Sequence, residues 1–273
     1  MSVTVSGVER IAEAFESARA EGRRAALMPY MMAGFPDLDS SRQIARAYVE
    51  GGADLIELGL PFSDPLADGP VIHAAGVAAL RAGVRVADAL SVARASAAEV
   101  PVVVMCYTNL VLARGLERFA DLLVEVGASG LIVPDLPLEE APATLAACDQ
   151  RGLALVPLVA PTTPDARLQS IGARARGFVY AVSVTGTTGE RATLEERLPS
   201  VISRARAHTE VPVAVGFGIG TPEQAAAAAL AGADGVIVGS RLVRAAGESA
   251  NPGDAITDLV RAFAAALREQ PTG

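Results

Sequence analysis

Short apolar runs alternate with longer amphipathic segments along the whole chain. The apolar runs predict eight strands, at residues 26–32, 54–58, 101–106, 130–134, 153–159, 177–182, 211–216 and 235–239. The segments between them predict eight helices, at residues 38–50, 73–97, 114–126, 138–151, 163–173, 194–208, 221–231 and 252–268. A further helix at residues 8–21 precedes the first strand, in a position to cap one end of the sheet.

The junction between a helix and a strand has the same pattern at three places. Glycine closes the predicted helix at Gly51, Gly127 and Gly232, and a short apolar strand follows each of them. Eight alternating strands and helices in 273 residues favour an α/β fold, a (β/α)8 TIM barrel in a single domain over residues 1–273. An open Rossmann-like sheet is the alternative, but no strand is followed by G-x-G-x-x-G opening a helix.

One predicted strand carries a carboxylate inside its apolar run. Ile56 and Leu58 share one face of this strand, whereas Leu55, Glu57 and Gly59 share the other. If helices cover the first face, Glu57 points into the barrel, where loss of water favours its protonated form. Glu57 would then be an acid held ready near neutral pH. The alternative interpretation is a glutamate paired with an arginine of a neighbouring strand.

The loop that follows this strand is rich in proline. Pro61, Pro65 and Pro70 restrict the backbone of a segment that also carries Asp68. The loop therefore predicts a second carboxylate above the same strand end, on a segment able to act as a lid.

Glycine gathers after the last three predicted strands. In parallel barrels the functional groups lie at the carboxyl ends of the strands, and the last loops often bind phosphate. Glycine lets the backbone approach an oxyanion closely, and a helix amino terminus adds N–H donors. Each glycine pair alone indicates a tight turn, whereas three on one rim predict a phosphate site without a basic side chain. The residues concerned are Gly186, Gly189, Gly216, Gly218, Gly239 and Ser240, the last of which would open a short helix.

Three tyrosines and one aspartate also fall near strand ends. Tyr30, Tyr107 and Tyr180 fit core aromatic residues whose hydroxyl groups reach the rim. For Tyr180 we favour a binding role, because it points to the start of the glycine loop. Asp135 either orients substrate or caps the following helix.

The composition argues against several kinds of partner and several kinds of catalytic chemistry. A net charge of −8 leaves no basic face for nucleic acid or an anionic membrane. No apolar run approaches the roughly 20 residues that span a bilayer, and Glu9 and Arg10 interrupt the amino terminus, so we expect a cytoplasmic protein. All 23 basic residues are arginine, which excludes a lysine Schiff base. Two histidines and two isolated cysteines predict no metal site, and carboxylates remain for acid and base chemistry.

Six segments of the chain resemble the tryptophan synthase alpha-chain family. The longest runs from Glu57 to Pro70, and the set is ELGLPFSDPLADGP, PYMMAGFPD, MCYTNLV, SVTGTTG, VGFGI and GVIVGS. The resemblance implies a lyase of tryptophan biosynthesis that cleaves indole-3-glycerol phosphate to indole and glyceraldehyde 3-phosphate. This retro-aldol reaction needs no cofactor on this chain.

The resemblance also implies roles for individual residues. Glu57 takes the place of the catalytic acid, and Asp68 accepts the indole N–H. The implied phosphate-binding and pocket residues are Gly189, Gly218, Gly239, Ser240, Tyr180, Thr188 and Phe217, with Ile72 holding the indole. Departures from the family pattern at Thr187, Tyr30, Met32 and Phe35 concern pocket dimensions rather than chemistry.

A partner follows from the same resemblance. It is a beta chain that carries pyridoxal phosphate and receives indole through a tunnel, in a heterotetramer of two alpha and two beta chains. The loops at 61–70 and 184–191 would close over substrate, and Asp64, Asn109 and Pro137 lie on the implied contact rim. Two other functions stay open: a stand-alone phosphate-binding barrel isomerase and a non-catalytic regulatory barrel subunit.

Overall fold

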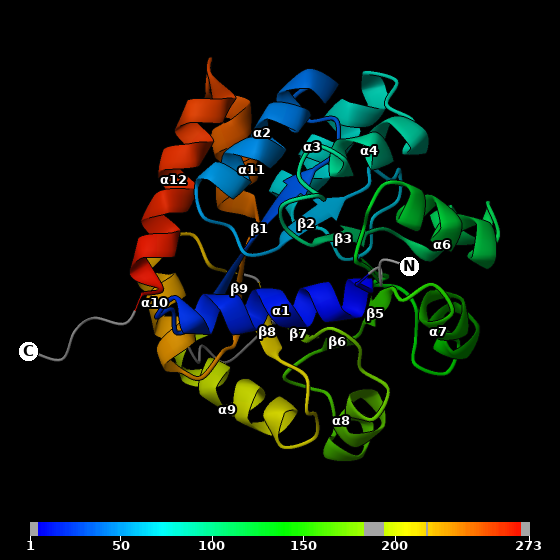
Figure 1. The fold of residues 1–273 in the computed structure, drawn as a ribbon, viewed down its shortest axis with the longest axis vertical. Helices are drawn as coiled ribbons and strands as arrows, with labels where there is room; N and C mark the ends of the chain where they lie inside the picture. The colour runs from blue at the N-terminus through cyan, green and yellow to red at the C-terminus, as the bar shows by residue number, and fades with distance from the viewer. Residues whose placement is uncertain (1–4, 183–193, 217, 269–273) are drawn as a thin grey trace, which may run out of the picture.

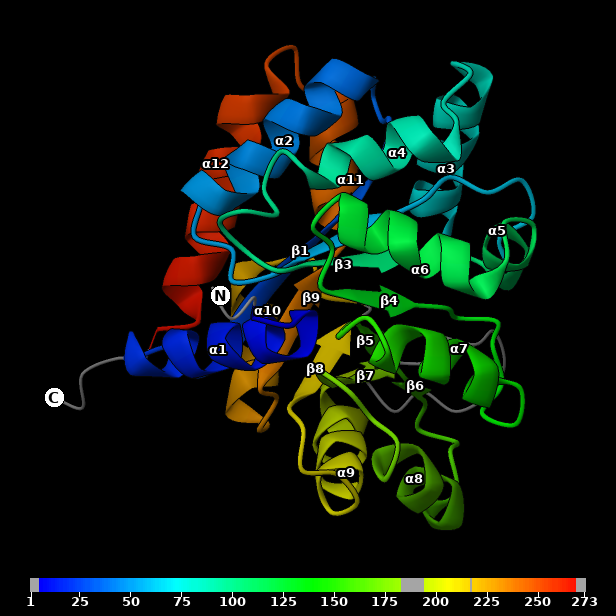
Figure 2. The same ribbon diagram turned by 45° about the vertical axis from the view of Figure 1, so that its right-hand side comes forward.

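Parallel strands form a nearly closed barrel surrounded by helices (Figures 1 and 2). The computed structural model describes residues 5–182, 194–216 and 218–268. Within these residues the strands are β1 Ala26–Met32, β2 Ile56–Gly59, β3 Val102–Met105, β4 Gly130–Ile132, β5 Ala154–Val156, β6 Leu158–Val159, β7 Val179–Val182, β8 Val213–Gly216 and β9 Gly235–Val238. The predicted TIM-barrel fold with an extra N-terminal helix is confirmed.

Pro157 connects the two end strands of the sheet, and this connection closes the barrel. The strand order is β5-β4-β3-β2-β1-β9-β8-β7-β6, so the two ends of the sheet, β5 and β6, are separated by Pro157 alone. The predicted strand at 153–159 is divided there: β5 pairs with β4, β6 pairs with β7, and Pro157 between them has no N–H to donate. The Pro157 carbonyl still accepts a hydrogen bond from the Tyr180 N–H at 2.9 Å. The eighth predicted strand thus becomes the ninth observed one.

Helices form the outer shell. Among the described residues they are α1 Gly7–Ala20, α2 Leu38–Glu50, α3 Pro70–Arg81, α4 Val86–Ala93, α5 Thr108–Leu112, α6 Leu116–Glu125, α7 Ala141–Asp149, α8 Asp165–Gly172, α9 Leu194–Arg206, α10 Pro222–Leu230, α11 Ser240–Glu248 and α12 Pro252–Ala266. The single helix predicted at 73–97 was wrong: Gly83, with φ +81°, separates α3 from α4. The short helix expected after Gly239 is α11, whereas α5 was not predicted.

Strand side chains alternate between the barrel interior and the helical shell. Ile56 and Leu58 belong to the large outer core, and Leu55 belongs to the interior core. Because Glu57 shares the Leu55 face, it points into the barrel.

The helix at the amino terminus closes one end of the barrel. α1 runs across the barrel in Figures 1 and 2, and it buries Ile11, Phe15 and Ala18 in the interior core. The Phe15 ring lies 6.0 Å from that of Phe178, centroid to centroid. Added Cβ atoms on Gly177 and Gly235, at the amino ends of β7 and β9, would crowd α1 side chains. The barrel interior is therefore left accessible from the carboxyl ends of the strands.

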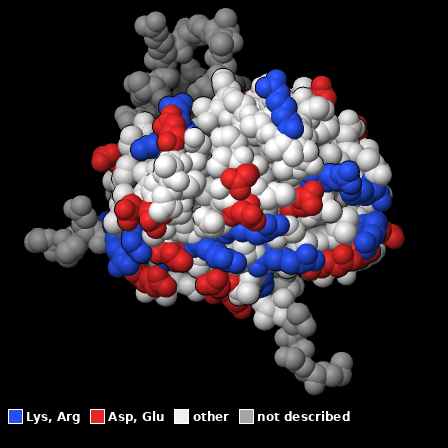
Figure 3. All heavy atoms as spheres, turned by 90° about the horizontal axis from the view of Figure 1, so that it is seen from above, with Lys and Arg blue, Asp and Glu red and all other residues white. Residues whose placement is uncertain are grey.

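Charges are mixed on the face shown in Figure 3. Arginine and acidic side chains are interspersed there, around a broad uncharged area. Among the residues that the structure describes, no helix has both the length and the apolar character to cross a membrane.

Candidate functional site

Glu57 lies in the barrel interior, on β2. Its residue is 2% exposed, and it is the registered neighbour of Tyr30 on β1. Both carboxylate oxygens are buried, and the Tyr180 hydroxyl interacts with them. Burial and the nearby charge of Asp68 raise the pKa of Glu57 to about 8, while the Tyr180 hydroxyl acts in the opposite direction. The protonated form of Glu57 therefore predominates at neutral pH.

Asp68 is held above the strand ends by Tyr107. The Tyr107 hydroxyl donates to Asp68 Oδ1 at 2.8 Å and accepts from the Ala67 N–H at 3.1 Å. The Phe62 ring stacks on Tyr107, with centroids 5.2 Å apart. Burial raises the pKa of Asp68, whereas the Tyr107 hydrogen bond and the charge of His73 lower it. Tyr107, which follows β3, thus contacts the proline-rich loop at Phe62 and at Ala67 and Asp68, contacts that the sequence reasoning missed.

Two tyrosines rise into the cavity over glycines of neighbouring strands. A Cβ on Gly59 would collide with the Tyr30 hydroxyl, and a Cβ on Gly216 would collide with the Tyr180 hydroxyl. Tyr30 pairs with Glu57 on the neighbouring strand, and Gly59 lies two residues further along that strand. In the same way Tyr180 pairs with Ala214, and Gly216 lies two residues further. Both glycines therefore face the barrel interior, nearer to the carboxyl ends of the strands than the paired residues. The glycines thus make room for both phenols beside Glu57. Burial raises the pKa of Tyr180, and the charge of Glu57 and its hydrogen bond with Tyr180 raise this pKa further.

One cavity of about 420 Å³ brings the predicted residues together. Of the ten site residues predicted from sequence, seven line it: Glu57, Asp68, Ile72, Tyr180, Gly218, Gly239 and Ser240. The other three, Thr188, Gly189 and Phe217, lie outside the described residues, as does the loop at 184–191. The cavity also contains Tyr30, which the sequence reasoning placed near the rim without a binding role, and Arg241 and Arg244, which it did not consider.

The glycine side of this cavity has the features of an anion site. Gly218 has φ +79°, and Gly239 is the N-cap of α11, with Ser240 as its first residue. The free N–H groups of the first turn of α11 therefore face the cavity rim. That turn contains no acidic residue, whereas Arg241 and Arg244 line the same cavity. Arg241 is the second residue of α11, where a cation opposes the helix dipole, and a bound anion would offset this.

Asp135 hydrogen-bonds to Thr108, the first residue of α5. Its Oδ1 accepts hydrogen bonds from the Thr108 N–H at 2.9 Å and the Thr108 hydroxyl at 3.0 Å. It therefore caps α5, not the helix that follows it.

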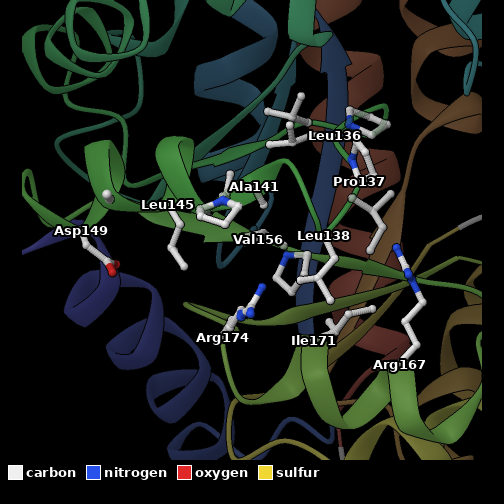
Figure 4. Close-up of a pocket in the computed structure, with 17 residues that line it drawn as sticks. Leu136, Pro137, Leu138, Ala141, Leu145, Asp149, Val156, Arg167, Ile171 and Arg174 are labelled. Carbon is white, nitrogen blue, oxygen red and sulfur yellow. The ribbon is translucent and has the colours of Figure 1, made fainter.

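A second cavity, of about 460 Å³, lies between α7 and α8 and is mainly apolar (Figure 4). Arg167 of α8 pairs with Glu139 at one end, with an N–O distance of 2.8 Å. This cavity shares Pro134 and Leu158 with the first one but includes neither Glu57 nor Asp68. The first cavity is therefore the candidate active site. Among the described residues, no group of three or more His, Cys, Asp or Glu side chains is arranged to hold a metal ion.

Comparison with known proteins decides the family. The family model described as tryptophan synthase alpha chain matches residues 15–270. The chain belongs to this family. A tryptophan synthase alpha chain from Prochlorococcus marinus is 49% identical over 236 residues, which are 86% of this chain and 86% of that protein. Another, from Methanosarcina mazei, is 45% identical over 260 residues, 95% of each chain.

Solved structures of the family have the same fold. A tryptophan synthase structure from Mycobacterium tuberculosis superposes with a TM-score of 0.88 at 42% identity, over 98% of this chain and 100% of that one. The resemblance found in the sequence is therefore confirmed. The family is that of an enzyme subunit and implies a beta-chain partner. Neither the stand-alone isomerase nor the non-catalytic barrel is favoured by these matches.

Proposed function

We propose that this chain is a lyase that cleaves indole-3-glycerol phosphate to indole and glyceraldehyde 3-phosphate. The observation that carries the proposal is the buried Glu57, whose pKa of about 8 leaves it protonated at neutral pH in a cavity that also contains Asp68. Such an acid can protonate a carbon atom of an electron-rich ring without a metal or a cofactor.

The reaction would proceed in two proton transfers. Glu57 gives its proton to the indole carbon that bears the side chain, which leaves a cationic ring and a carboxylate. Asp68 accepts the ring N–H and stabilises the cation, an attraction that exclusion of water strengthens. The Glu57 carboxylate then takes the proton of the hydroxyl on the adjacent carbon. The carbon–carbon bond breaks, its electron pair restores the aromatic ring, and the aldehyde forms.

The remaining residues would bind the substrate. Gly218, Gly239 and Ser240 are proposed to hold the phosphate, with Gly189 completing the site and Thr188 and Phe217 lining it. Ile72 would contact the indole, and Tyr180 would line the pocket beside the phosphate-binding residues. Ile72 is 9% exposed and packs with Tyr30 and Met105, which supports a flat apolar wall for the ring.

A beta chain that carries pyridoxal phosphate is the proposed partner, in a cytoplasmic assembly of two alpha and two beta chains. This chain itself would act as a single domain without a cofactor. Two large apolar side chains support a contact surface at the carboxyl end of the barrel. Leu66, in the proline-rich loop, is 85% exposed, and Leu112 of α5 is 57% exposed. They lie near Asp64 and Asn109 in the sequence, on the rim already expected to meet the partner.

Indole release from indole-3-glycerol phosphate tests the proposal. We expect release by the chain alone and faster release after a beta chain is added. Glu57→Gln should abolish release while phosphate-bearing substrate still binds, and Glu50→Gln, at an exposed glutamate of α2, should leave it unchanged. A wild-type chain that releases no indole with or without a beta chain would refute the proposal. If such a chain instead isomerised a sugar phosphate, the alternative function of a stand-alone barrel isomerase would be supported.

A further inference from the structure

The hydroxyl of Tyr30 is a buried polar group for which the described part of the chain supplies no partner. Tyr30 is 4% exposed, and its hydroxyl oxygen makes no hydrogen bond to any described residue. Leaving a buried hydroxyl unpaired disfavours folding, because the group gives up its bonds to water. The side chain is nevertheless held in place, since Gly59 leaves the space that the hydroxyl fills.

This hydroxyl lies beside the two proposed catalytic carboxylates. Tyr30 lines the same cavity as Glu57 and Asp68, and both carboxylates raise the pKa of its phenol in addition to burial. The phenol is therefore neutral at any pH at which the protein functions, and its O–H is available as a donor. An unpaired donor that faces a ligand cavity points to a ligand acceptor.

The proposed substrate has only a few polar groups, and most of them are assigned. Asp68 takes the ring N–H, and the glycine rim takes the phosphate. Two glycerol hydroxyls remain. Glu57 must reach the one next to the ring in order to deprotonate it, so the same oxygen comes within range of a donor beside Glu57.

We infer that the Tyr30 hydroxyl donates a hydrogen bond to the substrate oxygen on the carbon attached to the indole ring, an inference that rests on the proposed function. This oxygen gains negative charge while its proton moves to the Glu57 carboxylate, before the aldehyde is complete. A fixed donor stabilises that charge in a cavity that excludes water. Tyr30 is thus a third catalytic residue, acting on the second proton transfer.

Tyr30→Phe is the test, because it removes the hydroxyl and keeps the ring. We expect kcat/KM for indole-3-glycerol phosphate to fall about ten- to a hundredfold, the range for loss of one hydrogen bond to a group that develops charge. The variant should bind 3-(indol-3-yl)propyl phosphate as tightly as wild type, because this compound has the ring and the phosphate but neither hydroxyl. Its thermal midpoint should be no lower than that of wild type, since a buried unpaired group is removed.

Tyr48→Phe is the matched control. The Tyr48 hydroxyl is also buried, but it donates to the Tyr30 backbone carbonyl at 2.8 Å, in the outer core. This control should lower the thermal midpoint and leave kcat/KM within twofold of wild type.

Three outcomes would overturn the inference. Unchanged kcat/KM in Tyr30→Phe, with wild type releasing indole, would refute the role of Tyr30 alone. An equal loss of affinity for the propyl phosphate would show that the hydroxyl acts on the ring or the phosphate. Absence of indole release by wild type would refute the proposed function and this inference together.

Discussion

Replacing Glu57 with glutamine should stabilise the fold, and by more at high pH than at low pH. Folding raises the pKa of Glu57 from 4.5 to about 8, mainly through burial. Between these two pH values the folded chain binds a proton that the unfolded chain has lost. The free energy of unfolding of wild type therefore falls as pH rises. The contribution of protonated Glu57 to the free energy of unfolding is complete below pH 4.5 and is lost as pH rises through about 8.

The size of the effect follows from the same shift. One pKa unit corresponds to about 1.4 kcal/mol, so the pH-dependent advantage of the glutamine variant should grow by about 2.5 kcal/mol between pH 5.5 and 7.5. Glutamine has almost the same shape and does not titrate, so other carboxylates cancel in the difference between the two proteins.

Urea denaturation of both proteins at the two pH values measures this difference. Glu50→Gln removes an exposed glutamate and controls for loss of a surface carboxylate. If the difference between wild type and Glu57→Gln changes by less than about 0.5 kcal/mol over this range, Glu57 is ionised in the folded chain and the reasoning is wrong.

Four other predictions concern the cavity. Asp68→Asn should reduce single-turnover indole release by about 10²-fold or more, because it removes charge that stabilises the cationic ring; an unchanged rate would exclude Asp68 from the reaction. Tyr107→Phe should lower kcat about tenfold and make Asp68 harder to ionise, since Asp68 loses its 2.8 Å donor; a normal rate would show that the loop is positioned otherwise. The rate kcat/KM should fall as pH rises through about 8, where Glu57 loses its proton, and a flat profile from pH 6 to 9 would contradict that pKa. Arg241→Ala with Arg244→Ala should raise KM several-fold with little change in kcat, if both arginines attract the phosphate; equal KM values would limit the phosphate site to the backbone.

Local periodicity was sufficient to predict the barrel and the direction of Glu57. Strand alternation depends only on neighbours along the chain, so the pattern around Ile56 and Leu58 assigns Glu57 to the interior. Parallel strands also bring their carboxyl ends to one rim, which is why residues as distant in sequence as Asp68 and Ser240 line one cavity.

Contacts between strands and loops could not be predicted in this way. The division of one strand at Pro157 depends on which neighbours pair with each half. The bond from Tyr107 to Asp68 and the placement of Tyr30 above Gly59 depend on side-chain packing across strands. The break between α3 and α4 does have a sequence signal, because Gly83 interrupts the helical pattern and has φ +81°.

Deuterium labelling of the released indole tests the central claim most directly. Wild type and Glu57→Gln are mixed with indole-3-glycerol phosphate in D₂O under single-turnover conditions, and indole is analysed for its amount and for deuterium at the carbon that bore the side chain. Wild type should release indole with one deuterium there, and the variant should be slower by at least about 10³-fold. Deuterated indole released by the variant at a rate within tenfold of wild type would show that another group supplies the proton.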